Sequence, residues 1–528
     1  MSIRELRSLD GMRADVSAPI CIVGGGIAGL LVARSLANKG HRVIVIESGY
    51  NSFDDDVHAL NEIDDPLQRF TRSMTGRYRG LGGSSTRWGG RMIPLTAHDT
   101  ADRSYLGHAA WPIDVTKLQA YADEVQHLFS IKQGSFEDLP QAERARTAFP
   151  AKEETLTPRW PKCPSFRRCN LATLLRRDLM NDPKIQVWLG ATVCDFKVDP
   201  ERARLTTLVA RNFDNKILQV TASDFIFACG AIETTRLLLL MNESAGARIF
   251  EACDALGRYL QDHLEAEVAD IDRQNLELTN TLFAYRLVQS TRRDLHLELA
   301  SVAQERDSVA SAYFFVNMNL DDSPFGALKR LAHGWQQGHL DTKALLRLCR
   351  RVDLLARASY WRVARKQLFL PASTPLSLVA RIEQAPDRSN QISLSNQRDK
   401  LDLPKARIAW KPTELDERCF RSAVTNLRTY WKQAGFDRLC PLRLKPFVLE
   451  PETLLTSRAT DCAHPSGTTR MGTDPKNSVV GPTLRCHAIP NVAVASTAVF
   501  PTAGSANPTY TLMLLALWLA DTYALSMS

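Results

Sequence analysis

Three glycines near the start of the chain have the spacing of a dinucleotide-binding motif. They are Gly24, Gly26 and Gly29, and an acidic residue, Glu47, follows about 20 residues later. The first glycine permits a tight turn, the second lets the backbone approach a pyrophosphate, and the third lets a helix pack closely on a strand. A carboxylate at Glu47 can accept hydrogen bonds from ribose hydroxyls. The pattern therefore predicts a site for FAD or NAD, without separating the two.

The motif binds phosphates only if a strand and a helix surround it. Residues 19–23 form an apolar run that predicts a buried parallel strand. Residues 30–38 have apolar side chains near helical spacing, and residues 42–47 predict a second strand. The phosphates would lie at the N-terminus of the helix, where free N–H groups and the helix dipole favour negative charge. This β-α-β order supplies the context that the glycines require.

Four later segments are rich in small residues. Residues 80–90 read Gly-Leu-Gly-Gly-Ser-Ser-Thr-Arg-Trp-Gly-Gly, and residues 228–236 read Ala-Cys-Gly-Ala-Ile-Glu-Thr-Thr-Arg after a predicted strand. Residues 462–472 read Cys-Ala-His-Pro-Ser-Gly-Thr-Thr-Arg-Met-Gly, and residues 500–508 read Phe-Pro-Thr-Ala-Gly-Ser-Ala-Asn-Pro. In this order they resemble the flavin-contacting loop, the second signature and the C-terminal active-site block of the glucose–methanol–choline (GMC) oxidoreductase family.

The resemblance implies an FAD domain, a sheet-based substrate domain and an active site in which His464 and Asn507 face the flavin ring. It also implies a set of FAD-binding residues drawn from all the motifs, and we expect no metal. The expected FAD-binding residues are Gly24, Gly26, Gly29, Glu47, Gly82, Gly83, Ser84, Ser85, Trp88, Gly89, Val193, Ala228, Gly230, Thr234, Ala498, Pro508 and Thr509.

The loop that ends at Trp88-Gly89-Gly90 is similar to that of the sugar-oxidising branch of the family, near pyranose oxidases and sugar dehydrogenases. Some members of this branch link FAD covalently through a histidine just before the tryptophan. Arg87 occupies that position here, so we expect FAD to be bound non-covalently.

Alcohol oxidation removes a hydroxyl proton and a carbon-bound hydride, and the flavin N5 accepts the hydride. The protein must supply a base within hydrogen-bond reach of the hydroxyl. A neutral imidazole suits this role because its pKa lies near the working pH, and His464 is the candidate. Asn507 would orient the same hydroxyl; an alternative is that it caps the helix predicted after Pro508.

The remaining histidines have no comparable pattern. His487 reads as structural, and His98, His108 and His263 have no supporting sequence context. Ser466 lacks the accompanying His and Asp of a hydrolase. The eleven cysteines are scattered without metal-ligand spacing, which predicts reduced thiols, most of them in the core.

The net charge of +8 is concentrated in one window. Residues 326–370 contain ten Lys or Arg against two Asp, so the rest of the chain is close to neutral and general nucleic-acid binding is disfavoured. One interpretation is a solvated helical insertion. The alternatives are a lid over the substrate, a surface for a membrane or an anionic substrate, or a contact for a redox partner.

The expected fold class is α/β, with a Rossmann-like FAD-binding domain interrupted by an α+β substrate domain on an antiparallel sheet. We assign residues 1–105, 161–265 and 446–528 to the FAD-binding domain. Residues 106–160 form an insertion or lid and a part of the substrate domain, and residues 266–445 form the substrate domain with the basic helical insertion 326–370. Residues 1–16 are expected to be a loosely packed lead-in, and the chain shows neither a signal peptide nor a membrane-spanning run, so a cytoplasmic location is expected.

The leading hypothesis is an FAD-dependent oxidase or dehydrogenase that oxidises a hydroxyl of a sugar, cyclitol or glycoside. Its partners would be this small-molecule alcohol and O2 or another electron acceptor, and the oligomeric state is open. Two alternatives are an enzyme that oxidises a complex natural-product scaffold and a non-redox lyase that keeps FAD only as structure. An NAD-linked dehydrogenase is disfavoured because nothing after the first β-α-β unit resembles a nicotinamide site.

Overall fold

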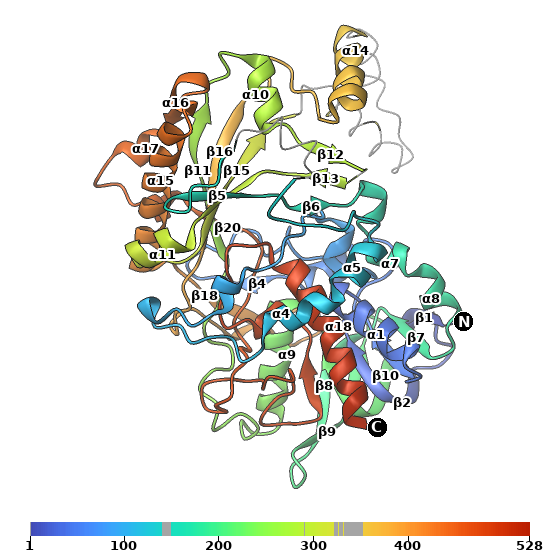
Figure 1. Cartoon of the computed structure of the whole chain (residues 1–528). Coiled ribbons are helices and arrows are strands. Elements are labelled where there is room, and N and C mark those ends of the chain that lie inside the picture. Colours follow the sequence, from blue (N-terminus) through green and yellow to red (C-terminus); the bar gives the residue numbers. More distant parts are fainter. Residues whose placement is uncertain are drawn as a thin grey trace.

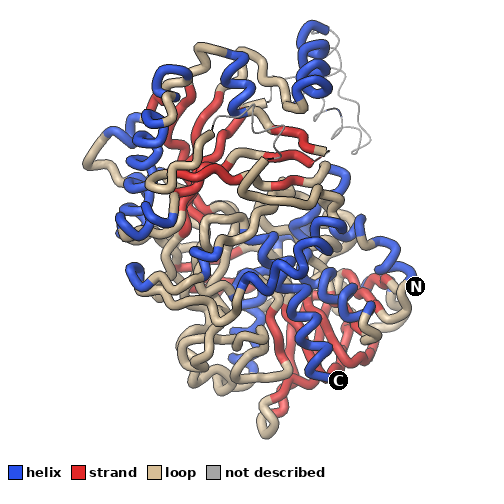
Figure 2. The backbone as a smooth tube through the Cα atoms, in the orientation of Figure 1, coloured by secondary structure: helices blue, strands red, loops and turns tan. Residues whose placement is uncertain are grey.

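The computed structural model describes residues 2–139, 149–289, 291–320, 326, 331 and 352–527; side chains are described as far as residue 523. Within these residues no helix is both long and apolar enough to cross a membrane. The ten cysteines in this part of the chain are free thiols. Figure 1 shows two bodies of secondary structure, one around each of two large sheets, and Figure 2 shows the loops that join them.

The first sheet is parallel except at one end. The strands run in the order β1-β7-β3-β2-β10-β9-β8, with β21 beside the C-terminal half of β10. Only β9 runs antiparallel to its neighbours. The strands are β1 (Ile3–Glu5), β2 (Arg13–Val23), β3 (Val43–Ile46), β7 (Ile185–Leu189), β8 (Thr192–Asp199), β9 (Arg204–Arg211), β10 (Ile217–Phe227) and β21 (Val492–Val494).

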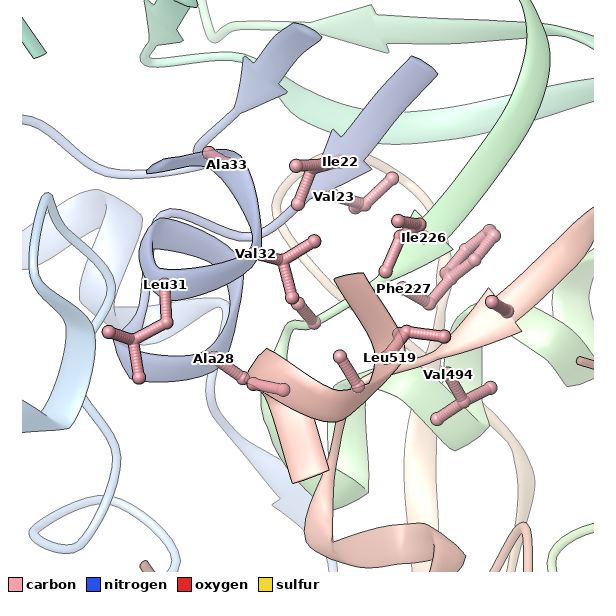
Figure 3. Close-up of a cluster of buried hydrophobic side chains, with 14 of the residues drawn as sticks. Ile22, Val23, Ala28, Leu31, Val32, Ala33, Ile226, Phe227, Val494 and Leu519 are labelled. Atoms are coloured by element: carbon pink, nitrogen blue, oxygen red, sulfur yellow. The ribbon is translucent and has the colours of Figure 1, made fainter. Parts of the chain in front are cut away.

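The predicted β-α-β unit is present as β2, α1 (Ile27–Asn38) and β3. Burial of apolar residues on both faces of the parallel strands explains their continuous hydrophobic runs. Figure 3 shows Val32 of α1 packed against the side chains of β2 and β10, with Leu519 of the last helix nearby. That helix, α18 (Pro508–Met527), packs on α1, so the beginning and the end of the chain share one core.

The N-terminal expectation is wrong. Residues 1–16 were expected to be a loose lead-in, but β1 pairs with β7 and β2 already begins at Arg13, opposite Ile217. The first half of β2 alternates exposed and half-buried residues, so its apolar side chains Ala14, Val16 and Ala18 do not form a continuous run. A search for apolar runs finds only its buried end, because backbone pairing with β10 holds the polar half in place.

The second sheet is antiparallel, in the order β19-β11-β16-β15-β14-β5, with β20 beside β11. The apolar face, which includes Leu264, Ile382 and Phe314, packs against α15 (Glu414–Gln433). The opposite face is unusually polar and carries His263, Glu383 and other charged side chains. The strands are β5 (Leu156–Arg159), β11 (His263–Ile271), β14 (His296–Leu299), β15 (Ala312–Met318), β16 (Leu376–Glu383), β19 (Leu442–Leu444) and β20 (Thr460–Asp461).

Two small sheets and several helices complete the described part. One sheet holds β12 (Arg286–Val288), β13 (Thr291–Arg293) and β6 (Lys162–Cys163), and the other holds β17 (Gln391–Arg398), β18 (Pro404–Ala409) and β4 (Ile63–Asp64). The remaining α-helices are α2 (Asp55–Ala59), α3 (Ala97–Thr100), α4 (Val115–Leu118), α5 (Ala122–Leu128), α7 (Leu171–Leu174), α8 (Arg176–Asn181), α9 (Gly230–Ser244), α10 (Leu276–Phe283), α11 (Ser301–Asp307), α14 (Val352–Tyr360), α16 (Phe436–Leu439) and α17 (Pro446–Leu449).

Most of the basic window, residues 326–370, lies outside the described residues. Its last part forms α14 and a π-helical turn at Trp361–Arg365, and α14 projects from the side of the antiparallel sheet in Figure 1. Leu354 and Trp361 are buried there, whereas Val352 and Val363 are exposed. The expected helix therefore exists at its C-terminal end, and its role stays a prediction.

Candidate active site

A groove runs along the carboxyl ends of the parallel strands, where open α/β sheets bind ligands. It holds about 1280 Å³ of empty space, part of it open to solvent. Its walls come from the end of β2, the start of α1, the end of β3, loop 76–79, the start of α9 and residues 463–465, 495–497 and 508–512. Segments from the beginning, middle and end of the sequence therefore meet at one site.

The glycines of the motif act as close-packing positions. A side chain on Gly24 would meet the carbonyl oxygen of Ala228 at 2.6 Å, and one on Gly29 would meet the oxygen of Gly24 at 2.0 Å. Gly26 differs, because a Cβ there would have no neighbour nearer than 3.9 Å. Its backbone faces the groove, opposite Gly83. Thus two glycines bring strand and helix together, while Gly26 leaves open the space that a cofactor would fill.

Glu47 lies at the end of β3 on the groove wall. Its two carboxylate oxygens accept hydrogen bonds from the backbone N–H groups of Gly25 and Gly49, each at 2.8 Å. Burial raises the pKa of this carboxyl, and the two backbone bonds oppose that rise. Each oxygen retains a second lone pair, so the fixed carboxylate can still accept from a ribose hydroxyl.

Charged residues that the motifs did not reveal also line the groove. Arg79 forms an ion pair with Glu233 at 2.9 Å and donates to the hydroxyl of Ser48. Arg77 donates to the carbonyl oxygens of Ser73 and Asn61, and burial together with Arg79 lowers its pKa to about 9. Two guanidinium groups beside a glycine-lined helix N-terminus suit a pyrophosphate. No sequence signal marked them, because an isolated arginine in a loop has no distinctive spacing.

His464 lies on the groove wall, in a loop held by a buried carboxylate. Asp262 accepts from the backbone N–H groups of Cys462 and His464, at 3.1 Å and 2.9 Å. The Nδ1 atom of His464 lies 2.8 Å from Nδ1 of His263, whose Nε2 lies 2.7 Å from the carbonyl oxygen of Gly504. Burial and the neighbouring His263 hold the pKa of His464 well below its usual value. The imidazole is therefore neutral near pH 7.

His263 is the residue that sequence reasoning missed. It was set aside because nothing around it in the sequence suggested chemistry. The contact with His464 exists because the first residue of β11 meets a loop about 200 residues away. Its fully buried side chain could be identified only from this tertiary approach.

Asn507 directly precedes Pro508, which begins α18 and lines the groove. The residue itself does not belong to the groove wall. Its Oδ1 atom is buried and has no hydrogen-bond partner among the described residues. A buried amide oxygen without a partner is costly, so this atom is suited to a group supplied by a ligand. The Oδ1 atom of Asn507 accepts no hydrogen bond from the described part of α18, so the alternative role as a helix cap has no support there.

The structure brings together most, but not all, of the expected FAD-binding residues. Those on the groove wall are Gly24, Gly26, Glu47, Gly83, Ser84, Val193, Ala228, Gly230, Pro508 and Thr509. Those elsewhere are Gly29, Gly82, Ser85, Trp88, Gly89, Thr234 and Ala498. Several of the latter shape the loops behind the wall: the hydroxyl of Ser85 donates to Gly82, and the indole of Trp88 donates to Cys169 at 2.9 Å. His464, the expected base, lies on the wall.

Comparison with known proteins agrees with this architecture. Residues 386–516 match the family model described as GMC oxidoreductase, and residues 19–52 match the model described as FAD dependent oxidoreductase. The chain is 34% identical over 131 residues to the C-glycoside 3-oxidase of Arthrobacter globiformis. The aligned residues make up 24% of this chain and 23% of that protein. The chain is 24% identical over 339 residues to the fructose dehydrogenase large subunit of Gluconobacter japonicus, 63% of this chain and 52% of that protein.

The alignments thus span about half or less of these curated relatives. Among solved structures, a pyridoxine 4-oxidase from Mesorbium loti superposes with a TM-score of 0.60 at 17% identity, covering 96% of this chain and 99% of that one. A formate oxidase from Aspergillus oryzae RIB40 gives a TM-score of 0.56 at 15% identity, covering 97% and 98%. The chain thus shares the fold of these two oxidases, and its C-terminal part matches the GMC oxidoreductase family model.

Proposed function

We propose that this protein is an FAD-dependent oxidase or dehydrogenase that oxidises a CH–OH group of a sugar, cyclitol or glycoside. The observation that carries the proposal is a neutral histidine, His464, on the wall of a groove whose other residues fit FAD. The sugar preference is supported by the names of the two curated relatives, which act on a C-glycoside and on fructose, and by the resemblance of the Trp88-Gly89-Gly90 loop.

The residues of this chain fit the cofactor on two observations. Gly26 leaves open the space that a side chain would fill, and Arg77 and Arg79 supply positive charge to the same groove. When bound, FAD would supply the hydride acceptor. Because Arg87 lies over the rings of Phe53 and Tyr78, at 4.7 Å from each centroid, and offers no nucleophile, we propose non-covalent attachment.

The protein's own part in the reaction is to handle the proton. His464 would accept the hydroxyl proton of the substrate, since a neutral imidazole has one nitrogen free to do so. Asn507 would donate an Nδ2–H to the same oxygen and stabilise the negative charge that develops as the proton leaves, while its buried Oδ1 would accept from another group of the bound ligand. Both residues come from the C-terminal part of the chain: His464 lies in the loop held by Asp262, and Asn507 directly precedes α18.

Anaerobic mixing with a panel of sugars, cyclitols and glycosides tests the proposal. At least one should bleach the flavin absorbance in the holoenzyme. His464→Ala should keep its FAD but be reduced at least about 10²-fold more slowly, the contribution typical of a positioned base. The exposed His127→Ala variant is the matched control and should behave as the wild type. Reduction of His464→Ala at the wild-type rate would reject the base assignment.

The same experiment separates the alternatives. Bleaching only by larger hydroxylated scaffolds would favour a natural-product tailoring enzyme, and cleavage of a substrate without bleaching would favour a lyase. Fast reoxidation of the reduced flavin by air would mark an oxidase, whereas slow reoxidation would mark a dehydrogenase that uses another electron acceptor.

A further inference from the structure

We infer that His263 is a positioning residue that fixes the tautomer of His464, so that Nε2 of His464 is the unprotonated atom available to the substrate. This inference rests on the proposed role of His464 as a base. It assigns a function to a residue that does not line the groove and acts only through its neighbour.

The tautomer follows from a chain of hydrogen bonds that can be ordered in only one way while both rings are neutral. A carbonyl oxygen can only accept, so the 2.7 Å contact with Gly504 requires that Nε2 of His263 carries a proton. A neutral imidazole has one N–H group, and Nδ1 of His263 is therefore an acceptor. The 2.8 Å contact between the two Nδ1 atoms then requires that Nδ1 of His464 donates. Nε2 of His464 is left bare.

The surroundings keep His263 neutral, which the ordering requires. Its side chain is 1% exposed, and burial together with Arg381 lowers its pKa to about 4. The carboxylates of Glu383 and Asp99 oppose this effect only in part. On the other ring, Arg381, Arg72 and Arg91 join His263 in disfavouring a charged His464. Burial and Arg381 therefore disfavour a positive charge on both rings before substrate arrives.

The arrangement also serves the proton transfer itself. When Nε2 of His464 takes the hydroxyl proton, the ring becomes an imidazolium whose two N–H groups both need acceptors. Nδ1 of His263 already accepts one of them, so no atom has to move. The planes of the two rings are nearly perpendicular, at 89°, so the rings do not stack and their contact is a hydrogen bond between the two Nδ1 atoms.

Substitution of His263 can separate hydrogen bonding from packing. His263→Leu fills a similar volume but removes the acceptor, and we expect at least a 10²-fold fall in the flavin-reduction rate constant with little change in substrate KM. His263→Gln and His263→Asn each carry one amide oxygen to accept from His464 and one NH2 group to donate to Gly504. At least one of them should recover most of the rate. His127→Leu is the matched control at an exposed position.

The tautomer of His464 is the measurement that distinguishes positioning from a purely structural role of His263. Nitrogen-15 NMR of histidine-labelled holoenzyme should show His464 with a protonated Nδ1 and an unprotonated Nε2 in the wild type, and a mixture or the reverse in His263→Leu. A protonated Nε2 in the neutral wild-type ring overturns the inference, whether or not His263→Leu folds. Loss of activity in His464→Ala with an unaffected His263→Leu overturns it and leaves the proposed function intact. Wild-type reduction of His464→Ala instead rejects the proposed function.

Discussion

At the scale of single residues, the groove depends on Gly26 because this residue has no side chain. Most glycines of the motif are fixed by backbone contacts, so substituting them would disturb the fold as well as the site. Gly26 is the exception, because its φ angle of −85° suits any residue and a Cβ there meets nothing closer than 3.9 Å. A side chain at this position would project only into the space proposed for the cofactor.

Gly26→Val should therefore fold and lose FAD. We expect its unfolding free energy without FAD to lie within about 1 kcal/mol of the wild-type apoprotein, since the added Cβ meets nothing closer than 3.9 Å. The bound flavin per protein, measured by absorbance after desalting, should fall at least tenfold. Gly11→Ala, at an exposed glycine with open surroundings, is the control. Full FAD occupancy in Gly26→Val would show that the phosphates lie elsewhere.

At the scale of elements, the antiparallel sheet stands out because its polar face is buried. Arg103 and Glu383 form an ion pair at 2.6 Å with both side chains fully buried, and Arg159 pairs with Glu298 at 3.0 Å. Such pairs add little net stability over an apolar core, but removing one partner is costly. The first pair ties the segment before α4 to Glu383, the register partner of His263 in β11, and the second pair joins the neighbouring strands β5 and β14.

Arg103→Met should destabilise the protein by about 3–5 kcal/mol, because Glu383 would remain buried without its partner. The pairing with Arg103 lowers the pKa of Glu383 to about 2 in the folded state, below the roughly 4.3 of an unfolded glutamate. Its contribution is therefore present above pH ~4.3 and is lost as the pH falls towards 2. The difference in thermal unfolding temperature between wild type and variant should become smaller as the pH falls from about 4.3 to about 2.

The double variant Arg103→Met/Glu383→Leu provides the control for that experiment. Removing both charges should recover part of the loss at neutral pH, since no unpaired carboxylate remains. A single variant as stable as the wild type at pH 7 would mean that the pair does not hold the sheet.

At the scale of the whole molecule, the groove lies between segments that are distant in the sequence, and two hydrophobic cores lie behind it. One core collects residues around the parallel sheet and α18, and the other collects residues around the antiparallel sheet and α15. We propose that these cores correspond to the FAD-binding and substrate domains expected from the motifs. A ligand bound in the groove would then stabilise the parallel-sheet core, because it would contact residues near both the beginning and the end of the sequence.

Removing FAD tests both this coupling and the proposed mode of attachment. Acid precipitation should release all the flavin into the supernatant, since we propose no covalent link. The apoprotein should unfold at a lower temperature than the holoenzyme. FAD restored at 100 times its Kd should return about 2.7 kcal/mol of stability. Flavin that stays with the precipitated protein would contradict non-covalent binding, and unchanged unfolding would contradict the coupling.

The parts of this architecture that were predictable from sequence are those encoded by neighbouring residues. The β-α-β unit, the buried end of β10 and the helix α18 follow from apolar runs and periodicity, and the glycines follow from their spacing. His263, Arg77 and the first half of β2 were not predictable, because their roles depend on pairing with distant segments. Asn507 lies between these cases: the motif identified it, but only the structure shows that its amide oxygen is buried without a partner in the described part of the chain.

The sharing of one groove by Gly26 and Pro508 also has a consequence for biosynthesis. Gly26 directly precedes α1, Pro508 begins α18, and the two helices pack together, although nearly the whole chain separates them. Ribosomes add residues at about 5–20 per second, so the nascent N-terminal motif must wait tens of seconds before α18 emerges to complete its wall. During that time, the apolar face of α1 that α18 later covers is exposed to other proteins. Cofactor loading would therefore follow translation, and the early motif would depend on chaperones or on rapid synthesis to avoid misassembly.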